Sequence, residues 1–201
     1  MKLYYSPGAC SLSPHILLRE AGLAFEPVLA STKTKKLPDG TDYNSINPKG
    51  QVPLLELDNG ERLSEGPVIA QYIADQVPQK KLLAPAGMAR YRVLEWLNFI
   101  TSELHKSYSP LFNPAMPEEG KAVFRKRLAE RYQWIDSQLA GKTFLTGEDL
   151  TPADIYLFVV TRWAKPVGVE ANGANLAAFM ERMNARPAVQ EALKAEGLLK
   201  A

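Results

Sequence analysis

The sequence predicts a mixed α/β domain followed by an all-helical domain. Short apolar segments typical of strands end near residue 63, and only long helical patterns follow the stretch Leu82-Leu-Ala-Pro-Ala-Gly87. With 201 residues, 46% hydrophobic and 23% charged, the chain is globular by composition and long enough for two packed units. We therefore expect a first domain over residues 1–79, a linker over 80–87 and a helical domain over 88–201.

The first domain begins with a β-α-β unit. Residues 2–5 predict a strand, residues 11–21 a helix that ends at Gly22, and residues 25–29 a second strand. Two such strands are parallel and joined by a right-handed crossover. After a polar stretch with at most a turn or two of helix, Asp58-Asn-Gly60 predicts an antiparallel hairpin. A helix from residue 64 to about 77 completes the order βαβ, then ββα.

The second half predicts helices only, over residues 90–109, 118–139, 151–163, 176–183 and 187–196. Thr151-Pro-Ala-Asp154 has the pattern of a capping box with proline at the first helical position. The helix that it starts is apolar nearly all round, so we expect it at the centre of the helical domain.

Composition and charge exclude several classes of protein. One cysteine allows neither an internal disulfide nor a Cys-based zinc site, and it fits a reducing compartment, so we expect a cytoplasmic protein without a metal. The first residues do not form a signal peptide, and no segment reaches the length of a membrane span. A net charge of +2 from evenly spread residues gives no footprint for nucleic acid.

Cys10 lies where the first strand gives way to a helix. The positive end of a helix favours an anion, and the thiolate is the nucleophilic form of cysteine. Free cysteines are also commonly small buried hydrophobes. From the residues alone, Cys10 is either a reactive thiol or an inert packing residue.

Pro53 ends the stretch Asn47-Pro-Lys-Gly-Gln-Val52-Pro53, which runs straight into a predicted strand. A cis Val52-Pro53 bond would let the preceding backbone face outward and pair with an extended peptide. A trans turn proline, which is far commoner, is the alternative.

Ser64-Glu65-Gly66-Pro67 lies between the hairpin and the next helix. Backbone N–H groups at a helix start can bind a carboxylate, and the Glu65 side chain can hold an ammonium group. The Ser-Glu pair is also typical of an ordinary N-cap, and the two roles are compatible. The short basic stretch Lys33-Thr-Lys-Lys36 indicates a solvated loop, from which one lysine can meet an anionic ligand.

Asn98, Ser102 and His105 follow one another at spacings of four and three, so they share one face of the predicted helix. A polar ridge beside an apolar stripe can line a cleft. His105 is either a structural residue, as lone helical histidines usually are, or a partner for a thiolate. His15 lies inside the helix 11–21, where we expect it to be packed or solvated.

The element order resembles the cytosolic glutathione transferase fold, whose N-terminal domain is thioredoxin-like. Over the whole chain, five motifs resemble the bacterial beta class more specifically: Tyr5-Ser-Pro-Gly-Ala-Cys10-Ser-Leu, Asn47-Pro-Lys-Gly-Gln-Val-Pro53, Leu63-Ser-Glu-Gly66, Glu95-Trp-Leu-Asn98 and Ser102-Glu-Leu-His105-Lys.

The resemblance implies a glutathione site with Cys10 beside the sulfur. Val52, preceding a cis Pro53, would pair with the cysteinyl backbone. In better-known classes a tyrosine or serine hydroxyl stabilises the glutathione thiolate, whereas Cys10 takes that place here, and Tyr5 is a secondary catalytic candidate.

The resemblance also implies contacts at the two ends of glutathione. Glu65 and Gly66 would grip the γ-glutamyl end, and Lys35 would meet the glycyl carboxylate.

The helical domain is expected to supply the remaining contacts. Asn98 and His105 would line the cleft, His105 also being a catalytic candidate. Ser102 and Glu103 would reach the neighbouring subunit's glutathione, which implies a twofold homodimer.

The implied activity is conjugation, in which glutathione is a co-substrate whose thiolate attacks a hydrophobic electrophile. A neighbouring alternative is a thiol-disulfide oxidoreductase or reductive dehalogenase that uses Cys10 covalently. An alternative of another class is a non-catalytic ligand-binding or interaction protein on the same fold. We expect Tyr108, Phe112 and Trp163 to line an apolar acceptor pocket, which does not identify the electrophile.

Overall fold

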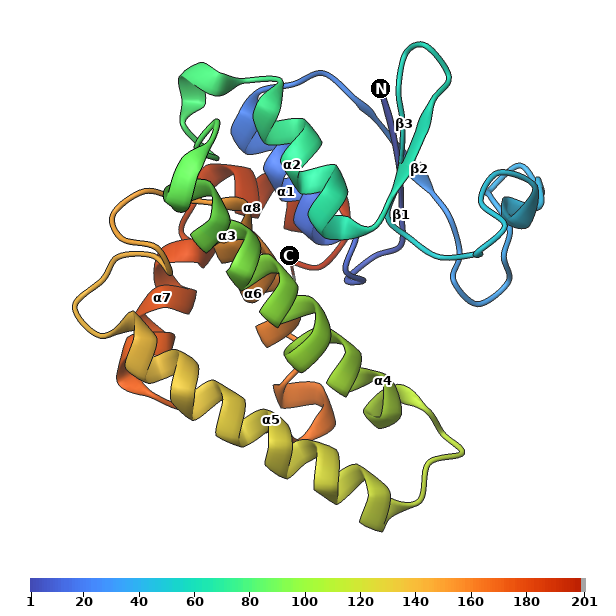
Figure 1. Ribbon diagram of the computed structural model, residues 1–201. Coiled ribbons are helices and arrows are strands. Elements are labelled where there is room, and N and C mark those ends of the chain that lie inside the picture. Colours follow the sequence, from blue (N-terminus) through green and yellow to red (C-terminus); the bar gives the residue numbers. More distant parts are fainter. Residues whose placement is uncertain (200–201) are drawn as a thin grey trace. The chain divides into compact units, whose positions relative to one another are not determined.

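The computed structural model describes residues 1–199 and divides the chain into two compact units (Figure 1). The first unit consists of Met1–Leu82 together with the segment from Arg186 onward, and the second is Leu83–Ala185. The change from the first unit to the second falls inside the predicted linker. The last helix groups with the first unit and not with the helical domain over 88–201 that the sequence predicts.

The first unit starts with the predicted β-α-β arrangement. β1 (Lys2–Tyr5) and β2 (Glu26–Leu29) pair in parallel, and α1 (Leu12–Ala21) connects them. Gly22 ends α1 in a left-handed conformation, with φ 70°, and its N–H donates to Arg19. Glycine adopts this conformation without a steric penalty, which explains why the helix stops here.

The hairpin and the second helix complete a four-stranded sheet in the order β2-β1-β3-β4. β3 (Leu54–Glu56) is antiparallel to both β1 and β4 (Arg62–Ser64), and α2 (Gly66–Asp75) follows. Between β2 and β3 the polar stretch holds the short 3₁₀ helix η1 (Tyr43–Ser45). The predicted order βαβ, then ββα, is confirmed.

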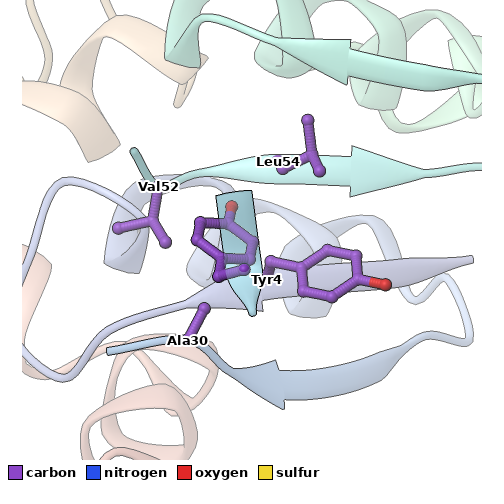
Figure 2. Packing of buried hydrophobic residues seen from close by; sticks show 5 residues of the cluster. Tyr4, Ala30, Val52 and Leu54 are labelled. Carbon is purple, nitrogen blue, oxygen red and sulfur yellow. The ribbon is translucent and has the colours of Figure 1, made fainter. Parts of the chain in front are cut away.

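The two central strands, β1 and β3, carry buried side chains on both faces of this sheet, whereas β2 is mostly exposed. Side chains alternate between the faces, so Leu3 and Leu55, paired across β1 and β3 and fully buried, lie opposite Tyr4 and Leu54. The second face carries a buried cluster of five residues: Tyr4, Ala30, Tyr43, Val52 and Leu54. Figure 2 labels all of them except Tyr43. Because three of its members belong to the segment between β2 and β3, this cluster fixes that segment against the sheet.

The helix predicted over 90–109 is longer and is not α-helical throughout. α3 (Gly87–Phe99) continues into a π-helical turn, η3 (Ile100–His105), and then into α4 (Lys106–Phe112). Within this stretch the Thr101 hydroxyl donates to the Leu97 carbonyl, and the Lys106 N–H donates to the Thr101 carbonyl, five residues back. Side-chain bonds of this kind compete with the regular ladder, and π turns are frequent at functional sites.

The other helices of the second unit are α5 (Glu118–Leu139), α6 (Pro152–Thr161) and α7 (Ala174–Asn184). Every residue of α6 is buried, and α6 contacts α3, η3 and α7. Its predicted central position is confirmed. Within residues 1–199, none of the helices combines the length and apolar character that a membrane crossing requires.

The predicted capping box at the start of α6 is also present. One carboxylate oxygen of Asp154 accepts from the N–H and the hydroxyl of Thr151, at 2.8 and 2.7 Å. The other accepts from the Leu145 N–H at 2.8 Å. Burial raises the pKa of Asp154 to about 6, although these hydrogen bonds act in the opposite direction.

The final helix, α8 (Pro187–Ala195), packs on α1, which explains its place in the first unit. Arg186, just before α8, donates to both carboxylate oxygens of Glu20, at 2.6 and 3.1 Å. A bidentate pair of this kind is stronger and more directional than a single contact.

The capping box yields a stability prediction. In Asp154→Asn the amide offers one acceptor oxygen where the carboxylate satisfies three donors, so we expect the free energy of unfolding to fall by about 1–3 kcal/mol in urea titrations. Asp149→Asn, at an exposed position just before the same helix, is the matched control and should change stability by less than about 0.5 kcal/mol. Equal effects of the two substitutions would contradict the capping role.

Candidate functional site

Cys10 lies in a closed loop just before α1. The Ser11 hydroxyl accepts from the Ser6 N–H at 3.1 Å and donates to the Ser6 carbonyl at 3.3 Å. The Ala9 N–H also donates to Ser6. These bonds join the two ends of the loop, so the half-buried Cys10 is held at the N-terminal end of the helix.

The Cys10 thiol meets the backbone of Val52. Its Sγ donates to the Val52 carbonyl oxygen at a distance of 3.3 Å, and the predicted cis bond between Val52 and Pro53 is present. Within residues 1–199, no group accepts a hydrogen bond from the Val52 N–H. Val52 therefore offers an extended peptide a strand-like donor directly beside the thiol.

The loop that precedes Val52 is tightly fixed. The carbonyl of Gln51 accepts from the Tyr43 hydroxyl at 2.9 Å and from the Asn47 amide at 2.7 Å. Gly50 has φ 58°, and a Cβ atom there would lie 2.7 Å from the Asn44 side-chain oxygen. Both observations favour glycine at position 50, because a side chain there would strain the backbone and force the Asn44 side chain to move.

Charged side chains lie on either side of this loop. The Lys35 ammonium donates to the Gly50 carbonyl at 2.7 Å. The Lys49 ammonium donates to Glu65 at 2.7 Å and to the Ser64 hydroxyl at 3.0 Å. Glu65 immediately precedes α2, with φ 70°. The first unit thus brings the predicted residues Lys35, Val52 and Glu65 to the same loop region.

A buried pair supports the Cys10 loop from the far end of the chain. Glu196 accepts from the Gly8 N–H at 2.9 Å and lies 2.8 Å from Nδ1 of His15. The side chains of His15 and Glu196 are both completely buried, which confirms that His15 is packed. Burial, together with the negative charge of Glu196, raises the pKa of Tyr5. The Tyr5 hydroxyl can therefore donate a hydrogen bond near neutral pH but is a poor base.

In the second unit, His105 lies half-buried in an aromatic environment. Its Nδ1 is 2.5 Å from the Tyr156 hydroxyl, and its ring lies edge-on to Trp163 with the centroids 5.0 Å apart. These contacts fix the orientation of the imidazole ring.

The three aromatic residues predicted for an acceptor pocket lie together. The ring centroids of Tyr108 and Trp163 are 5.6 Å apart, and those of Phe112 and Trp163 are 5.9 Å apart. Phe112 is 54% exposed, so part of this apolar surface is accessible. Burial raises the pKa of Tyr108, whose hydroxyl is bonded to that of Tyr132 at 2.8 Å.

Asn98, Ser102 and Glu103 have different environments. Asn98 and Ser102 are exposed, and the Ser102 hydroxyl donates to the Asn98 carbonyl at 3.0 Å. Glu103 accepts from Arg127 and Arg131, each at 3.0 Å, and these hydrogen bonds lower its pKa. Glu103 is therefore held as a carboxylate against α5.

Comparisons with known proteins identify the family to which this chain is similar. The profile of the glutathione S-transferase N-terminal domain matches residues 8–76, and that of the C-terminal domain matches residues 99–187. The glutathione S-transferase GstA of Escherichia coli O157:H7 is 50% identical over 98% of this chain and 100% of its own length. The chain belongs to the glutathione S-transferase family.

Solved structures refine this classification. A sphingomonad glutathione S-transferase complexed with glutathione has a TM-score of 0.95 and 45% identity, over 99% of this chain and all of that one. A beta-class glutathione S-transferase of Sphingomonas chungbukensis has a TM-score of 0.95 and 44% identity, with the same coverage. The resemblance to the bacterial beta class is thereby confirmed, and the chain is a transferase of this family.

Sequence reasoning missed the residues that hold the candidate side chains or their loops in place: Lys49 and Glu196 in the first unit, and Tyr156, Arg127 and Arg131 in the second. Contacts such as His15 to Glu196, which are 181 positions apart, leave no periodic signal in the sequence. Lys49 lies within the motif over residues 47–53, but its side-chain partners become apparent only when β4 is placed beside the loop. Within residues 1–199 there is no cluster of three or more His, Cys, Asp or Glu side chains suited to a metal ion.

The buried pair yields a prediction for Cys10. In Glu196→Gln one oxygen remains for two polar partners, so we expect the free energy of unfolding to fall by about 1–3 kcal/mol and iodoacetamide to alkylate Cys10 faster. Glu191→Gln is the matched control, since Glu191 is exposed and pairs only at the surface with Arg19. An unchanged alkylation rate in Glu196→Gln would show that Glu196 does not restrain the loop.

Proposed function

We propose that the protein conjugates the thiol of glutathione to hydrophobic electrophiles, with Cys10 beside the glutathione sulfur. The observation that carries this proposal is the juxtaposition of the Cys10 thiol with Val52, whose N–H has no acceptor within residues 1–199. A peptide that pairs with Val52 through its own cysteinyl backbone would direct that cysteine side chain toward Cys10.

The charges on either side of the loop suit the two ends of glutathione. Lys35 supplies a cation for the glycyl carboxylate. Glu65 supplies an anion for the γ-glutamyl ammonium group, and the N–H of Gly66 begins α2, where backbone donors favour a carboxylate.

Catalysis would rest on thiolate stabilisation and on proximity. The N-terminal end of α1 favours negative charge at the sulfur, and hydrogen bonds in the site hold the thiolate in place. His105, with its ring fixed by Tyr156, is a candidate donor to this charge, and Tyr5 is a secondary one. The aromatic surface of Phe112 and Trp163, packed against the fully buried Tyr108, suits an apolar electrophile.

A second candidate activity is thiol-disulfide exchange. The half-buried Cys10 thiolate would attack glutathione disulfide, forming a mixed disulfide and releasing one glutathione thiolate. The observation that favours this reaction is the same contact with Val52, which would bring the cysteine of a docked glutathione next to Cys10.

The proposal extends to assembly and location. The exposed Asn98 and Ser102, with Glu103 held by its two arginines, would complete a glutathione site in a cytoplasmic homodimer. Sedimentation equilibrium at micromolar concentration tests whether the protein is a dimer, and a monomer would contradict the proposed homodimer.

Replacing Cys10 distinguishes the two activities. If conjugation depends on the hydrogen bonds of the site, Cys10→Ala keeps the rate with a chlorodinitrobenzene within about tenfold of wild type and loses exchange with glutathione disulfide. Cys10→Ser is the control for the size of the side chain. Loss of conjugation in Cys10→Ala with intact glutathione binding would instead make covalent chemistry at Cys10 the main activity. Failure of the wild-type protein to conjugate or bind glutathione would overturn the proposed function.

The mass of the native protein is a second, independent test of the Cys10 position. After exposure to glutathione disulfide, we expect wild type to gain the mass of one glutathione and to lose it with dithiothreitol, because Cys10 is the only cysteine. Wild type that stays unmodified under these conditions would contradict a glutathione sulfur beside Cys10.

A further inference from the structure

The Lys49 side chain is paired with Glu65, the carboxylate that the proposed function assigns to the ammonium group of glutathione. Its ammonium lies 2.7 Å from Oε1 of Glu65 and 3.0 Å from the Ser64 hydroxyl. Two of the three donors of a lysine ammonium group are thus used at the start of α2.

We infer that Lys49 is an internal competitor for the ammonium subsite and so determines which ligands gain affinity there. This inference rests on the proposed function. When a ligand ammonium reaches Glu65, two like charges would meet on one carboxylate, so Lys49 must withdraw. A ligand without an ammonium group leaves the Lys49–Glu65 ion pair intact and gains no affinity from Glu65.

The position of Lys49 on the loop favours this exchange. Its backbone N–H donates to the Asn47 side chain at 3.2 Å, and the next residue, Gly50, donates to the Asn47 carbonyl at 2.8 Å. The backbone of this turn is fixed, so the lysine stem starts from a defined point beside Glu65.

The exposure of the pair makes the exchange easy. The side chains of Lys49 and Glu65 are 52% and 62% exposed, so a displaced ammonium group returns directly to water. Exposed ion pairs contribute little net stability, and we therefore expect a modest effect on affinity rather than a block.

The inference makes Lys49 a specificity residue rather than a ligand of glutathione. Selectivity is a difference between affinities, and Lys49 lowers the affinity of ligands that bring a cation to Glu65 while leaving the affinity of other ligands unchanged. Glutathione carries such a cation at its γ-glutamyl end.

The test is calorimetric titration with S-methylglutathione, whose blocked sulfur cannot form a disulfide with Cys10. Lys49→Met removes the charged ammonium group and keeps an unbranched stem of similar length, so we expect binding about two- to fivefold tighter than in wild type. Lys49→Arg restores the cation and should bind like wild type. Lys80→Met is the control for net charge, because Lys80 is exposed beyond the other end of α2.

A second ligand isolates the ammonium group. Desamino-S-methylglutathione differs only in lacking that group, and Lys49→Met should not bind it more tightly than wild type does. Unchanged or weaker binding of S-methylglutathione by Lys49→Met would overturn the inference while leaving the proposed function standing. Equal gains in affinity for both ligands in Lys49→Met would overturn the inference as well. Absence of S-methylglutathione binding by every protein, wild type included, would overturn the proposed function and this inference together.

Discussion

Two segments 42 positions apart meet where the Cys10 thiol donates to the Val52 carbonyl, and the geometry of the site depends on how each segment is held there. Each segment is fixed from its own side. Ser11 closes the loop that carries Cys10, whereas Tyr43 and Asn47 hold the carbonyl of the residue before Val52. The thiol and the Val52 backbone are thus positioned by separate supports, as a preorganised site requires.

The last segment of the chain belongs to the same support. Glu196 bonds the backbone of Gly8, and Leu198 lies within 3.5 Å of the position that a Cβ atom on Gly8 would occupy. The residues that follow α8 therefore stabilise the loop that carries Cys10. This arrangement explains why α8 groups with the first unit and connects the stability of the C-terminal segment with the placement of Cys10.

The sequence predicted the features that depend on local chemistry. The order of the elements in the first domain, the capping box at Thr151 and Asp154, the end of α1 at Gly22 and the buried α6 all follow from turn residues and periodicity. The sequence could not predict what depends on distant pairing. The π turn at Ile100–His105 arises from hydroxyl and backbone bonds that compete with an otherwise ordinary helical pattern. Lys49, Tyr156 and Glu196 acquire their roles only from neighbours that the folded chain brings to them.

The most direct test of the account is a crystal structure of the protein with S-methylglutathione. We expect a cysteinyl backbone paired with the N–H and carbonyl of Val52, the sulfur next to Cys10, and the ligand ammonium on Glu65 where Lys49 lies in the free protein. A ligand bound elsewhere, or one whose cysteinyl backbone makes no hydrogen bond with Val52, would contradict it.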